Sequence, residues 1–476
     1  NKIIISTIFF NFSLKKLMKQ IYLVFILLAA CNSIEENKIF IGGHIINPSS
    51  KHLTIYNGDK LIDSLILDKD NKFMYENDSM SSGIYKLEHP PKNQTIFVEP
   101  GDSMWFRVNT KDFDASISFS GKGAAKNNFL MDTYLELKNE RSFLSSKYSE
   151  NSKKFKSIID SLMLLKNTKW KKFDSINILS DLAKKITKSS FVYSYANRLE
   201  RYALIRGNKK NLDSDSINYF KFRKKLSLKE EELSLFEPYI KYIMSYSSNK
   251  SLVNNQYFIT NKNKTNFNIS RLKVIDMEIT SFKLRSTLFR SIAYDELINF
   301  NNHKSHKEFI AFFSKLENGA DQYINELTSL YLAIENMQTG KKLPSIEIED
   351  SNFRKFNSSS LYGNKNTVIY FWSQTQMNYF KNTYELVLNY RKKFPNYRFI
   401  GICLEPLNSL VIDFQKEMNI PTENQFAMVN FENGSKKWVL TMLNKGIIID
   451  KNGFIKEGFG IFTSDKFEEI LYNNYR

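Results

Sequence analysis

The sequence has 476 residues, of which 42% are hydrophobic and 14% aromatic, so it can form about two to four domains with substantial cores. Its net charge of +18 comes from lysines spread along the chain, and the absence of a clustered basic stripe argues against a nucleic-acid-binding protein. The two cysteines, Cys31 and Cys403, are too few for a disulfide framework or a cysteine-based metal cluster.

The N-terminal segment has the pattern of a targeting sequence. Met18 reads as the start, Lys19 as the charged region, and residues 21–28 as an apolar region too short to span a bilayer. The Leu-Ala-Ala-Cys sequence that ends at Cys31 resembles the signal of bacterial lipoproteins, in which this cysteine carries the lipid. We therefore expect residues 1–31 to be a lipoprotein signal region and the mature chain to be anchored to a membrane without crossing it. An uncleaved signal anchor with a buried cysteine is the alternative.

The residues after the lipidated cysteine indicate which membrane the protein is sent to. Glu35 and Glu36 resemble signals that send some lipoproteins to the outer face of the outer membrane. We expect an outer-membrane lipoprotein that faces the periplasm or the cell surface. The second cysteine, Cys403, lies in an apolar run and is expected to be an inert, buried strand residue.

Residues 38–125 are expected to form a small β domain. Turn sequences such as Asn57-Gly58 and Pro100-Gly101 separate short apolar runs, and this spacing predicts a small β-sandwich or barrel. The segments 98–103 and 120–124 resemble a small β domain that often precedes thioredoxin-like domains in bacterial lipoproteins. Glu99 and Asp102 have no evident partner and are expected to be solvated turn residues. The candidate strands are 39–46, 53–56, 60–67, 72–75, 84–88, 95–98, 104–108 and 117–119.

The sequence Gly121-Lys122-Gly123 superficially suggests a phosphate-binding loop. That loop requires four residues between its first glycine and the Gly-Lys pair, followed by Ser or Thr, whereas Ala124 follows here. A turn between a strand and a helix is the better interpretation.

Residues 126–338 are expected to form a helical region, because apolar residues recur there at three- and four-residue spacing. Lys/Asn/Ser-rich breaks are expected near 207–213 and 247–265. His303 and His306 are three residues apart, but no third ligand is evident and no metal site or cofactor is expected. Residues 339–344 are expected to be a hinge. The candidate helices are 128–147, 153–172, 191–204, 233–246, 284–300, 308–316 and 323–337.

Residues 345–476 alternate between strand and helix patterns. Helices between strands, followed by a hairpin and a last helix, predict an α/β sandwich with a mixed sheet. The candidate strands are 367–371, 397–404, 446–450 and 454–458, and the candidate helices are 378–394, 407–418 and 465–472.

The strand ending in Phe371-Trp372 and the segments 399–402 and 447–453 resemble the thioredoxin-like domain of membrane-anchored thiol–disulfide oxidoreductases. The resemblance implies that the active-site cysteines of that family fall on Gln376 and Tyr379. The family's cis-proline falls on Asn444. Overall, a multidomain α+β chain is expected, with an N-terminal β-sandwich, a central helical region and a C-terminal thioredoxin-like domain.

The resemblance implies dithiol exchange, but this sequence lacks both cysteines that the reaction needs. Neither Gln376 nor Tyr379 can form a disulfide, so dithiol exchange is not expected. The favoured interpretation is a non-catalytic binding or scaffold protein, in which a groove at Trp372, Gln376, Tyr379 and Asn444 holds an extended peptide of an envelope partner. The alternative is that these residues only cover the hydrophobic core and form no binding groove. An accessory redox role, and an enzyme of another class that uses the β or helical part, remain open.

Overall fold

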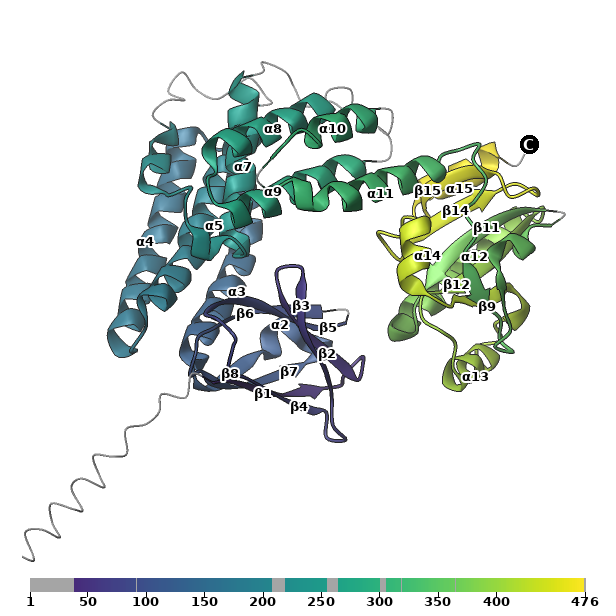
Figure 1. The fold of residues 1–476 in the computed structure, drawn as a ribbon, viewed down its shortest axis with the longest axis horizontal. Coiled ribbons are helices and arrows are strands. Elements are labelled where there is room, and N and C mark those ends of the chain that lie inside the picture. The colour runs from purple at the N-terminus through teal and green to yellow at the C-terminus, as the bar shows by residue number, and fades with distance from the viewer. Residues whose placement is uncertain are drawn as a thin grey trace, which may run out of the picture. The chain divides into compact units, whose positions relative to one another are not determined.

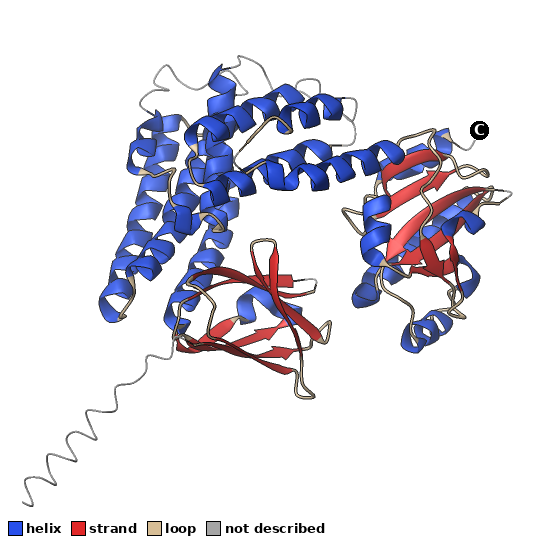
Figure 2. Cartoon of the chain, viewed as in Figure 1, coloured by secondary structure: helices blue, strands red, loops and turns tan. Residues whose placement is uncertain are grey.

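The computed structural model describes residues 38–90, 92–207, 219–254, 264–299, 305–317, 319–363 and 365–474. The predicted signal region, with Met18 and Cys31, lies outside the described residues. The chain divides into two compact units, residues 1–131 and 132–476 (Figure 1). Strands occur in two separate stretches of the chain, and helices occupy the stretch between them (Figure 2).

The described part of the first unit contains two four-stranded sheets, with strand orders β4-β1-β7-β8 and β3-β2-β5-β6. Strand β1 pairs with β7 in parallel, whereas the other neighbours are antiparallel. A short helix, α2 (Phe113–Ser116), precedes the last strand. The strands are β1 (Ile39–Ile46), β2 (His52–Asn57), β3 (Lys60–Ile66), β4 (Lys72–Asn77), β5 (Gly83–His89), β6 (Lys92–Val98), β7 (Ser103–Asn109) and β8 (Ser118–Lys122).

Alternating side chains explain why these segments form strands. In β7, Met104, Phe106 and Val108 are buried while the residues between them are more exposed, so each strand has one apolar face. Gly58 takes φ +62 in the tight turn between β2 and β3, which a glycine adopts without steric cost. Each of the eight strands predicted from the sequence overlaps a strand of the structure.

The prediction that Glu99 and Asp102 are solvated turn residues is wrong. The ammonium group of Lys126, in the first turn of α3 (Ala124–Ser146), lies 2.6 Å from Glu99 Oε2 and 2.7 Å from Asp102 Oδ2. Asp102 and Lys126 are 5% and 4% exposed. The sequence distance between the turn and the helix concealed this buried ion triad.

Two further contacts fix the start of α3 on the sheets. The side-chain amide of Asn127 donates to the carbonyl oxygen of Phe97 in β6 (2.8 Å) and lies 3.2 Å from the sulfur of Met104 in β7, so it joins both sheets. Gly123 has φ +91, and a Cβ there would lie 2.3 Å from the Asp102 carboxylate. The Gly121-Lys122-Gly123 segment therefore ends β8 and leads into α3, as expected for a strand-to-helix turn.

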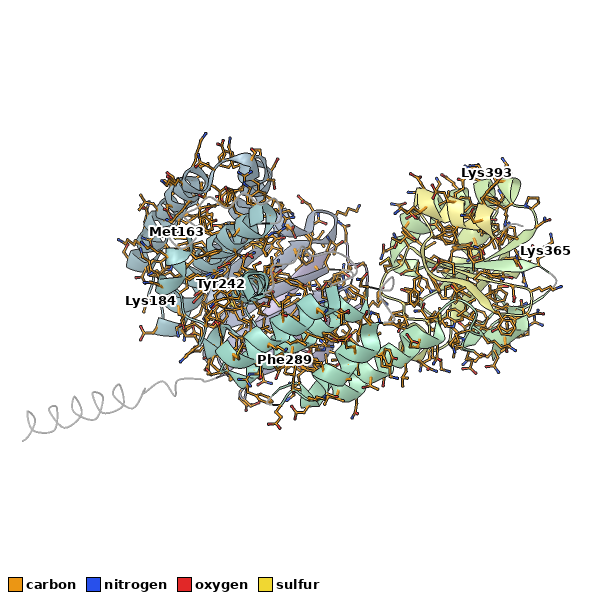
Figure 3. All side chains as sticks on the ribbon, turned by 90° about the horizontal axis from the view of Figure 1, so that it is seen from above. Met163, Lys184, Tyr242, Phe289, Lys365 and Lys393 are labelled. Carbon is orange, nitrogen blue, oxygen red and sulfur yellow. The ribbon has the colours of Figure 1, made fainter. Side chains whose placement is uncertain are left out.

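The middle of the chain is helical, and its core is rich in aromatic side chains. Phe155 of α4 stacks on Tyr202 of α5 at 4.3 Å, while Tyr242 and Phe289 lie buried among the other helices (Figure 3). Helix α5 packs along α7, and α7, α8 and α9 pack in succession. The helices after α3 are α4 (Ser152–Ile176), α5 (Asp181–Gly207), α7 (Glu237–Asn254), α8 (Lys264–Glu278), α9 (Phe282–Leu297), α10 (His306–Phe313) and α11 (Ile324–Asn336).

Two expectations for this region are corrected. The predicted break at 247–265 is too long, because residues up to Asn254 belong to α7. Helix α8 (Lys264–Glu278) was not predicted at all, since it begins within an Asn/Lys-rich segment and its buried residues include Asn268 and Arg271.

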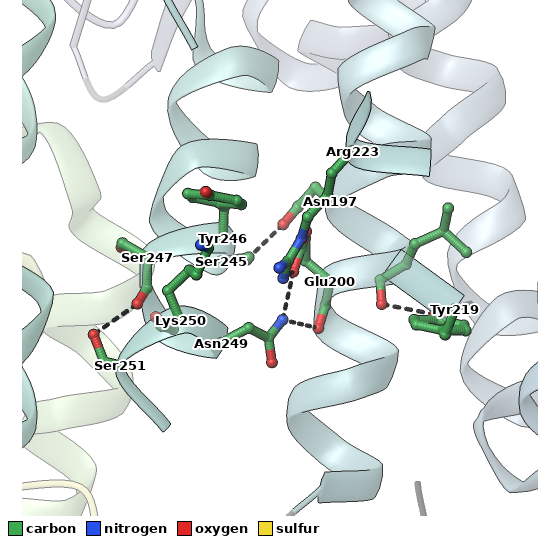
Figure 4. Close-up of polar contacts among 12 residues, drawn as sticks. Asn197, Glu200, Tyr219, Arg223, Ser245, Tyr246, Ser247, Asn249, Lys250 and Ser251 are labelled. Atoms are coloured by element: carbon green, nitrogen blue, oxygen red, sulfur yellow. Dashed lines mark hydrogen bonds and ion pairs between the residues drawn. The ribbon is translucent and has the colours of Figure 1, made fainter. Parts of the chain in front are cut away.

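A buried ion pair holds part of the helical region together (Figure 4). Glu200 of α5 is fully buried, and its carboxylate accepts two hydrogen bonds from Arg223, each of 2.7 Å. Asn249 of α7 donates to the same carboxylate (2.6 Å) and to the Glu200 carbonyl oxygen (2.9 Å). The carboxylate is thus satisfied by groups of this chain, and we assign the cluster a structural role.

The last part of the chain forms a mixed sheet of seven strands, in the order β10-β9-β13-β12-β11-β14-β15. Strands β11, β12 and β13 run parallel, while β14 and β15 form an antiparallel hairpin beside β11. The strands are β9 (Glu347–Glu349), β10 (Lys355–Asn357), β11 (Asn366–Trp372), β12 (Tyr397–Cys403), β13 (Gln425–Met428), β14 (Lys445–Ile449) and β15 (Ile455–Ile461). The helices are α12 (Met377–Lys393), α13 (Ser409–Glu417), α14 (Phe431–Lys437) and α15 (Asp465–Asn473).

Helices cover both faces of this sheet. Side chains of α12, α13 and α15 join one core with Val368, Tyr370 and Trp372 of β11. On the other face, Phe371 contacts Trp438 at the end of α14 at 6.0 Å between ring centroids. Strand β11 is therefore central and buried, and its end is held from both sides.

The predicted hinge at 339–344 is a paired segment. The amide of Gly340 donates to the Ile455 carbonyl oxygen (2.8 Å), and the Ile455 amide donates to the carbonyl oxygen of Lys341 (2.8 Å). A Cβ at Gly458 would lie 2.1 Å from the Met337 carbonyl oxygen, so this glycine allows the two backbones to approach. The end of α11 is consequently fixed to β15.

Among the described residues, no helix is both long and apolar enough to cross a membrane.

Candidate functional site

The candidate site is the strand–turn–helix formed by β11, residues 373–376 and α12. Strand β11 ends at Trp372 in the middle of the sheet, and α12 begins at Met377. The first amides of a helix carry partial positive charge and lack partners within the helix, so this position commonly holds reactive groups. The strand that ends in Phe371-Trp372 and the helix pattern after it predicted this location.

Trp372 lies in the core rather than at the surface. Its side chain is fully buried and stacks on Phe380 of α12, with ring centroids 4.0 Å apart and an interplanar angle of 11°. This stacking sets the distance between the end of β11 and the first turn of α12. Trp372 thus positions the turn and does not line an open groove.

The two positions that the resemblance assigns to cysteines flank the start of α12. Gln376 is half-buried and is the N-cap residue of the helix, but its side chain makes no capping hydrogen bond. Its amide donates to the Ser373 carbonyl oxygen (3.1 Å). Tyr379 is also half-buried, and burial raises the pKa of its hydroxyl. Neither side chain is a nucleophile at neutral pH.

Asn444 lies directly before β14. Tyr370 pairs with Gly446, and continuing this antiparallel register places Asn444 opposite Trp372. Its carbonyl oxygen accepts a hydrogen bond from the Phe462 amide (2.7 Å), and its side-chain amide donates to Thr463 Oγ1 (3.4 Å). Asn444 therefore joins the loop before β14 to the loop after β15.

Sequence reasoning missed the residue that closes the turn, Glu405. Its carboxylate accepts hydrogen bonds from the Ser373 hydroxyl (2.5 Å) and the Gln374 amide (3.0 Å). The Cys403 thiol lies 3.4 Å from the same carboxylate. The available signal was an acidic residue two positions after a buried strand that is parallel to β11, because parallel strands end at the same edge of a sheet.

Burial and the charge of Glu405 together suppress the reactivity of the Cys403 thiol near the turn. Cys403 is fully buried, and burial, followed by the charge of Glu405, raises the pKa of its thiol far above the usual range. The thiolate is the reactive form of cysteine, so Cys403 is chemically inert in the folded protein. This agrees with the expectation from its strand context.

Among the described residues, no group of three or more His, Cys, Asp and Glu side chains is arranged to hold a metal ion. Of the two histidines considered, His306 is buried in α10, and His303 lies outside the described residues.

The topology around the site supports the expected fold. A strand–helix–strand unit (β11, α12, β12) is followed by a third parallel strand, then by the β14–β15 hairpin and a final helix, α15. This order of strands and helices is that of a thioredoxin-like domain. The chain is a multidomain α/β protein that contains such a domain.

No protein-family model and no curated protein matches the sequence. Solved structures that resemble part of the chain include the thioredoxin domain of a thiol-disulfide oxidoreductase from Bacteroides vulgatus, with 18% identity and a TM-score of 0.23. That match covers 28% of this chain and 98% of the other. A thiol:disulfide interchange protein from a Bacteroides species has 16% identity and a TM-score of 0.23, covering 29% of this chain and 87% of the other.

Proposed function

We propose that this chain is a lipoprotein of the cell envelope whose thioredoxin-like domain binds a protein or peptide partner and performs no dithiol exchange. The observation that carries the proposal is the turn between β11 and α12. Gln376 and Tyr379 occupy the positions where the resemblance implies cysteines, and the Glu405 carboxylate closes the turn with two hydrogen bonds.

Dithiol exchange requires an accessible thiolate and a second thiol that resolves the mixed disulfide. In the described part of the chain, Cys403 is the one cysteine, and it is buried with a raised pKa. A carboxylate at the turn also disfavours a nearby thiolate, because two negative charges repel each other. The geometry therefore suits recognition better than redox chemistry.

The surface beside the turn offers apolar contact area. Met442 and Ile461 are 45% and 43% exposed, and both lie next to the loops joined by Asn444. Ile461 pairs across the hairpin with Lys445, the residue that follows Asn444. We propose this surface, defined by Met442, Asn444, Ile461 and Thr463, as the place where a partner binds, with the apolar side chains at its centre and the Asn444 amide and Thr463 hydroxyl beside them.

The absence of redox activity is tested by insulin reduction with a thiol reductant. The wild-type chain should give no turnover above the blank. The double variant Gln376→Cys with Tyr379→Cys supplies both thiols at the start of α12 and should gain activity if the domain has the proposed fold. Clear turnover by the wild-type protein would overthrow the redox-inactive proposal.

Partner binding is tested by affinity capture from detergent-solubilised membranes, followed by identification of the bound proteins. Met442→Lys should abolish recovery of a reproducible partner, because a charge at the centre of an apolar contact is costly to bury. Met74→Lys is the matched control, since Met74 is 65% exposed on β4, and it should leave recovery unchanged. Equal recovery with both variants would exclude the proposed surface.

Anchoring is tested by metabolic labelling with palmitate. Label should be incorporated into the wild-type chain and lost in Cys31→Ala; label that persists in the variant would refute lipidation at this cysteine. We also propose an outer-membrane location. Protease treatment of intact cells distinguishes a cell-surface orientation, in which the chain is cleaved, from a periplasmic one.

A further inference from the structure

The outer face of α4 combines a high density of lysines with exposed leucines. The helix contains seven lysines and two aspartates, a net charge of +5 over 25 residues, whereas the whole chain carries +18 over 476 residues. The charge of the protein is thus less diffuse than the sequence suggested. Part of this charge is neutralised on the side facing α3, where Lys166 and Lys169 bind Glu136.

The lysines on the other side of α4 point away from the core. Phe155 and Ile159 are the buried residues of the helix, and Lys153, Lys171 and Lys172 are exposed. Within the part of the chain that the structure describes, the ion pairs of α4 involve its other lysines and none of these three. They form two basic positions, one near each end of the helix.

Two leucines lie between these basic positions. Leu164 and Leu165 are 66% and 67% exposed, so two adjacent apolar side chains face the solvent. Ile176, the last residue of the helix, and Ile178, two residues beyond it, are also strongly exposed. Leu164 borders a shallow hollow of about 400 Å³, whose lining residues are Lys153, Lys156, Ser157, Asp160, Ser161 and Leu164.

We propose that this outer face of α4 binds the surface of a bilayer that contains anionic phospholipids. The ammonium groups of Lys153, Lys171 and Lys172 would meet headgroup phosphates, and Leu164 and Leu165 would contact the boundary between headgroups and acyl chains. Such a combination of basic and apolar side chains on one helix face is characteristic of interfacial binding.

Charge complementarity selects this occupant. An acidic protein would satisfy the lysines but gives no reason for two adjacent leucines to be exposed between them. A neutral apolar partner would cover the leucines but leave the lysines without counter-charges. The carboxylate of Asp160 would repel a headgroup phosphate, but it is already paired with the ammonium group of Lys156 at 2.5 Å. Lys153 therefore leaves the hollow with a net positive charge. An anionic lipid surface satisfies both features.

This inference does not depend on lipidation, so it is tested in a chain that cannot be lipidated. The full chain carrying Cys31→Ser is floated with phosphatidylcholine vesicles that contain or lack phosphatidylglycerol. The measured quantity is the increase in binding caused by phosphatidylglycerol. The basic residues that precede the apolar segment at 21–28 add the same increase to every variant, so differences between variants report on α4. The increase should shrink at high salt.

Variants locate the contact. Lys171→Gln with Lys172→Gln should weaken the phosphatidylglycerol-dependent binding roughly 30-fold, since each basic residue near an anionic surface contributes about fivefold. Lys224→Gln with Lys225→Gln makes the same change at another pair of exposed, adjacent lysines and should have no such effect. Equal weakening by both pairs, or binding that does not depend on phosphatidylglycerol, would overturn the proposal.

A second measurement uses the wild-type side chains. Acetylation of lysines in the full chain, with and without anionic vesicles, should show protection of Lys153, Lys171 and Lys172 but not of Lys224 and Lys225. If all five react alike in both conditions, α4 is not the contact. Capture of α4 by an acidic protein with no protection by vesicles would likewise reject the lipid surface.

Discussion

Lys445 makes the stability of the thioredoxin-like domain depend on pH in an unusual direction. The side chain is 3% exposed, and its ammonium donates to the carbonyl oxygens of Trp438 (2.7 Å) and Val439 (3.1 Å). Burial lowers the pKa of this lysine from 10.5 to about 7, and the charge of Glu457 offsets only part of that effect. The charged form is therefore costly in the folded state.

The sign and size of the pH dependence of the free energy of unfolding follow from proton linkage. Between the folded pKa of about 7 and the unfolded value of 10.5, the unfolded chain binds more protons than the folded one, so the free energy of unfolding rises with pH. Below pH 7 both states are protonated and the full penalty applies. The slope is at most about 1.4 kcal/mol per pH unit, and the stability gained from pH 7 to pH 10 is roughly 3 to 4 kcal/mol.

The assay compares the wild type with Lys445→Met by urea unfolding at several pH values from 7 to 10. Trp105→Phe and Trp170→Phe in the background confine the fluorescence signal to Trp372 and Trp438, which both lie in this domain. The variant also leaves two buried carbonyl oxygens without their donor, which costs about 1 to 3 kcal/mol each. The informative quantity is consequently the difference in pH dependence and not the absolute stability.

The free energy of unfolding of the wild type should rise relative to that of Lys445→Met by roughly 3 to 4 kcal/mol over this range. Lys451→Met removes a lysine from the exposed turn before β15 and should follow the wild type. Parallel curves for the wild type and Lys445→Met would refute the reasoning, because they would show that burial does not displace the titration of Lys445.

Three further predictions concern buried charges and the free thiol. Lys126→Met should destabilise the β domain by about 3 to 5 kcal/mol in thermal unfolding, because it leaves two largely buried carboxylates without their cation; a loss below 1 kcal/mol would contradict the buried triad. Glu200→Gln should destabilise the helical region by roughly 3 to 5 kcal/mol in urea unfolding. Glu432→Gln, which breaks the exposed ion pair with Lys436, should leave the stability essentially unchanged. Cys403 should resist alkylation by iodoacetamide at pH 8 in the folded protein and react once urea unfolds it, as measured by peptide mass spectrometry; rapid modification of the folded chain would show that the thiol is accessible.

The sequence was most informative where a strong periodic pattern met distinct turn residues. Alternating side chains and Asn-Gly or Pro-Gly turns marked all eight strands of the β domain. The strands β9, β10 and β13 were missed because each has three or four residues, too few to show a period. Helix α14, with seven residues, was missed for the same reason.

At the candidate site, the sequence could locate the turn but not its partner. The strand ending at Trp372 and the helix pattern after Gln376 follow from local propensity. The bond between Ser373 and Glu405 joins residues 32 positions apart, and it depends on the parallel register of β11 and β12. Lys126 and its two carboxylates show the same limit, because such contacts exist only once the sheets and helices have packed.

The pairing of residues 340–343 with the start of β15 determines how the last domain can be separated from the chain. A shortened protein beginning at residue 345, the boundary that the sequence suggests, would leave the Ile455 amide and carbonyl without the partners that Gly340 and Lys341 provide. An exposed strand edge of this kind recruits other strands and promotes self-association. A soluble, monomeric form of this domain should therefore retain the residues that follow α11, so that its outermost strand keeps its own covering segment.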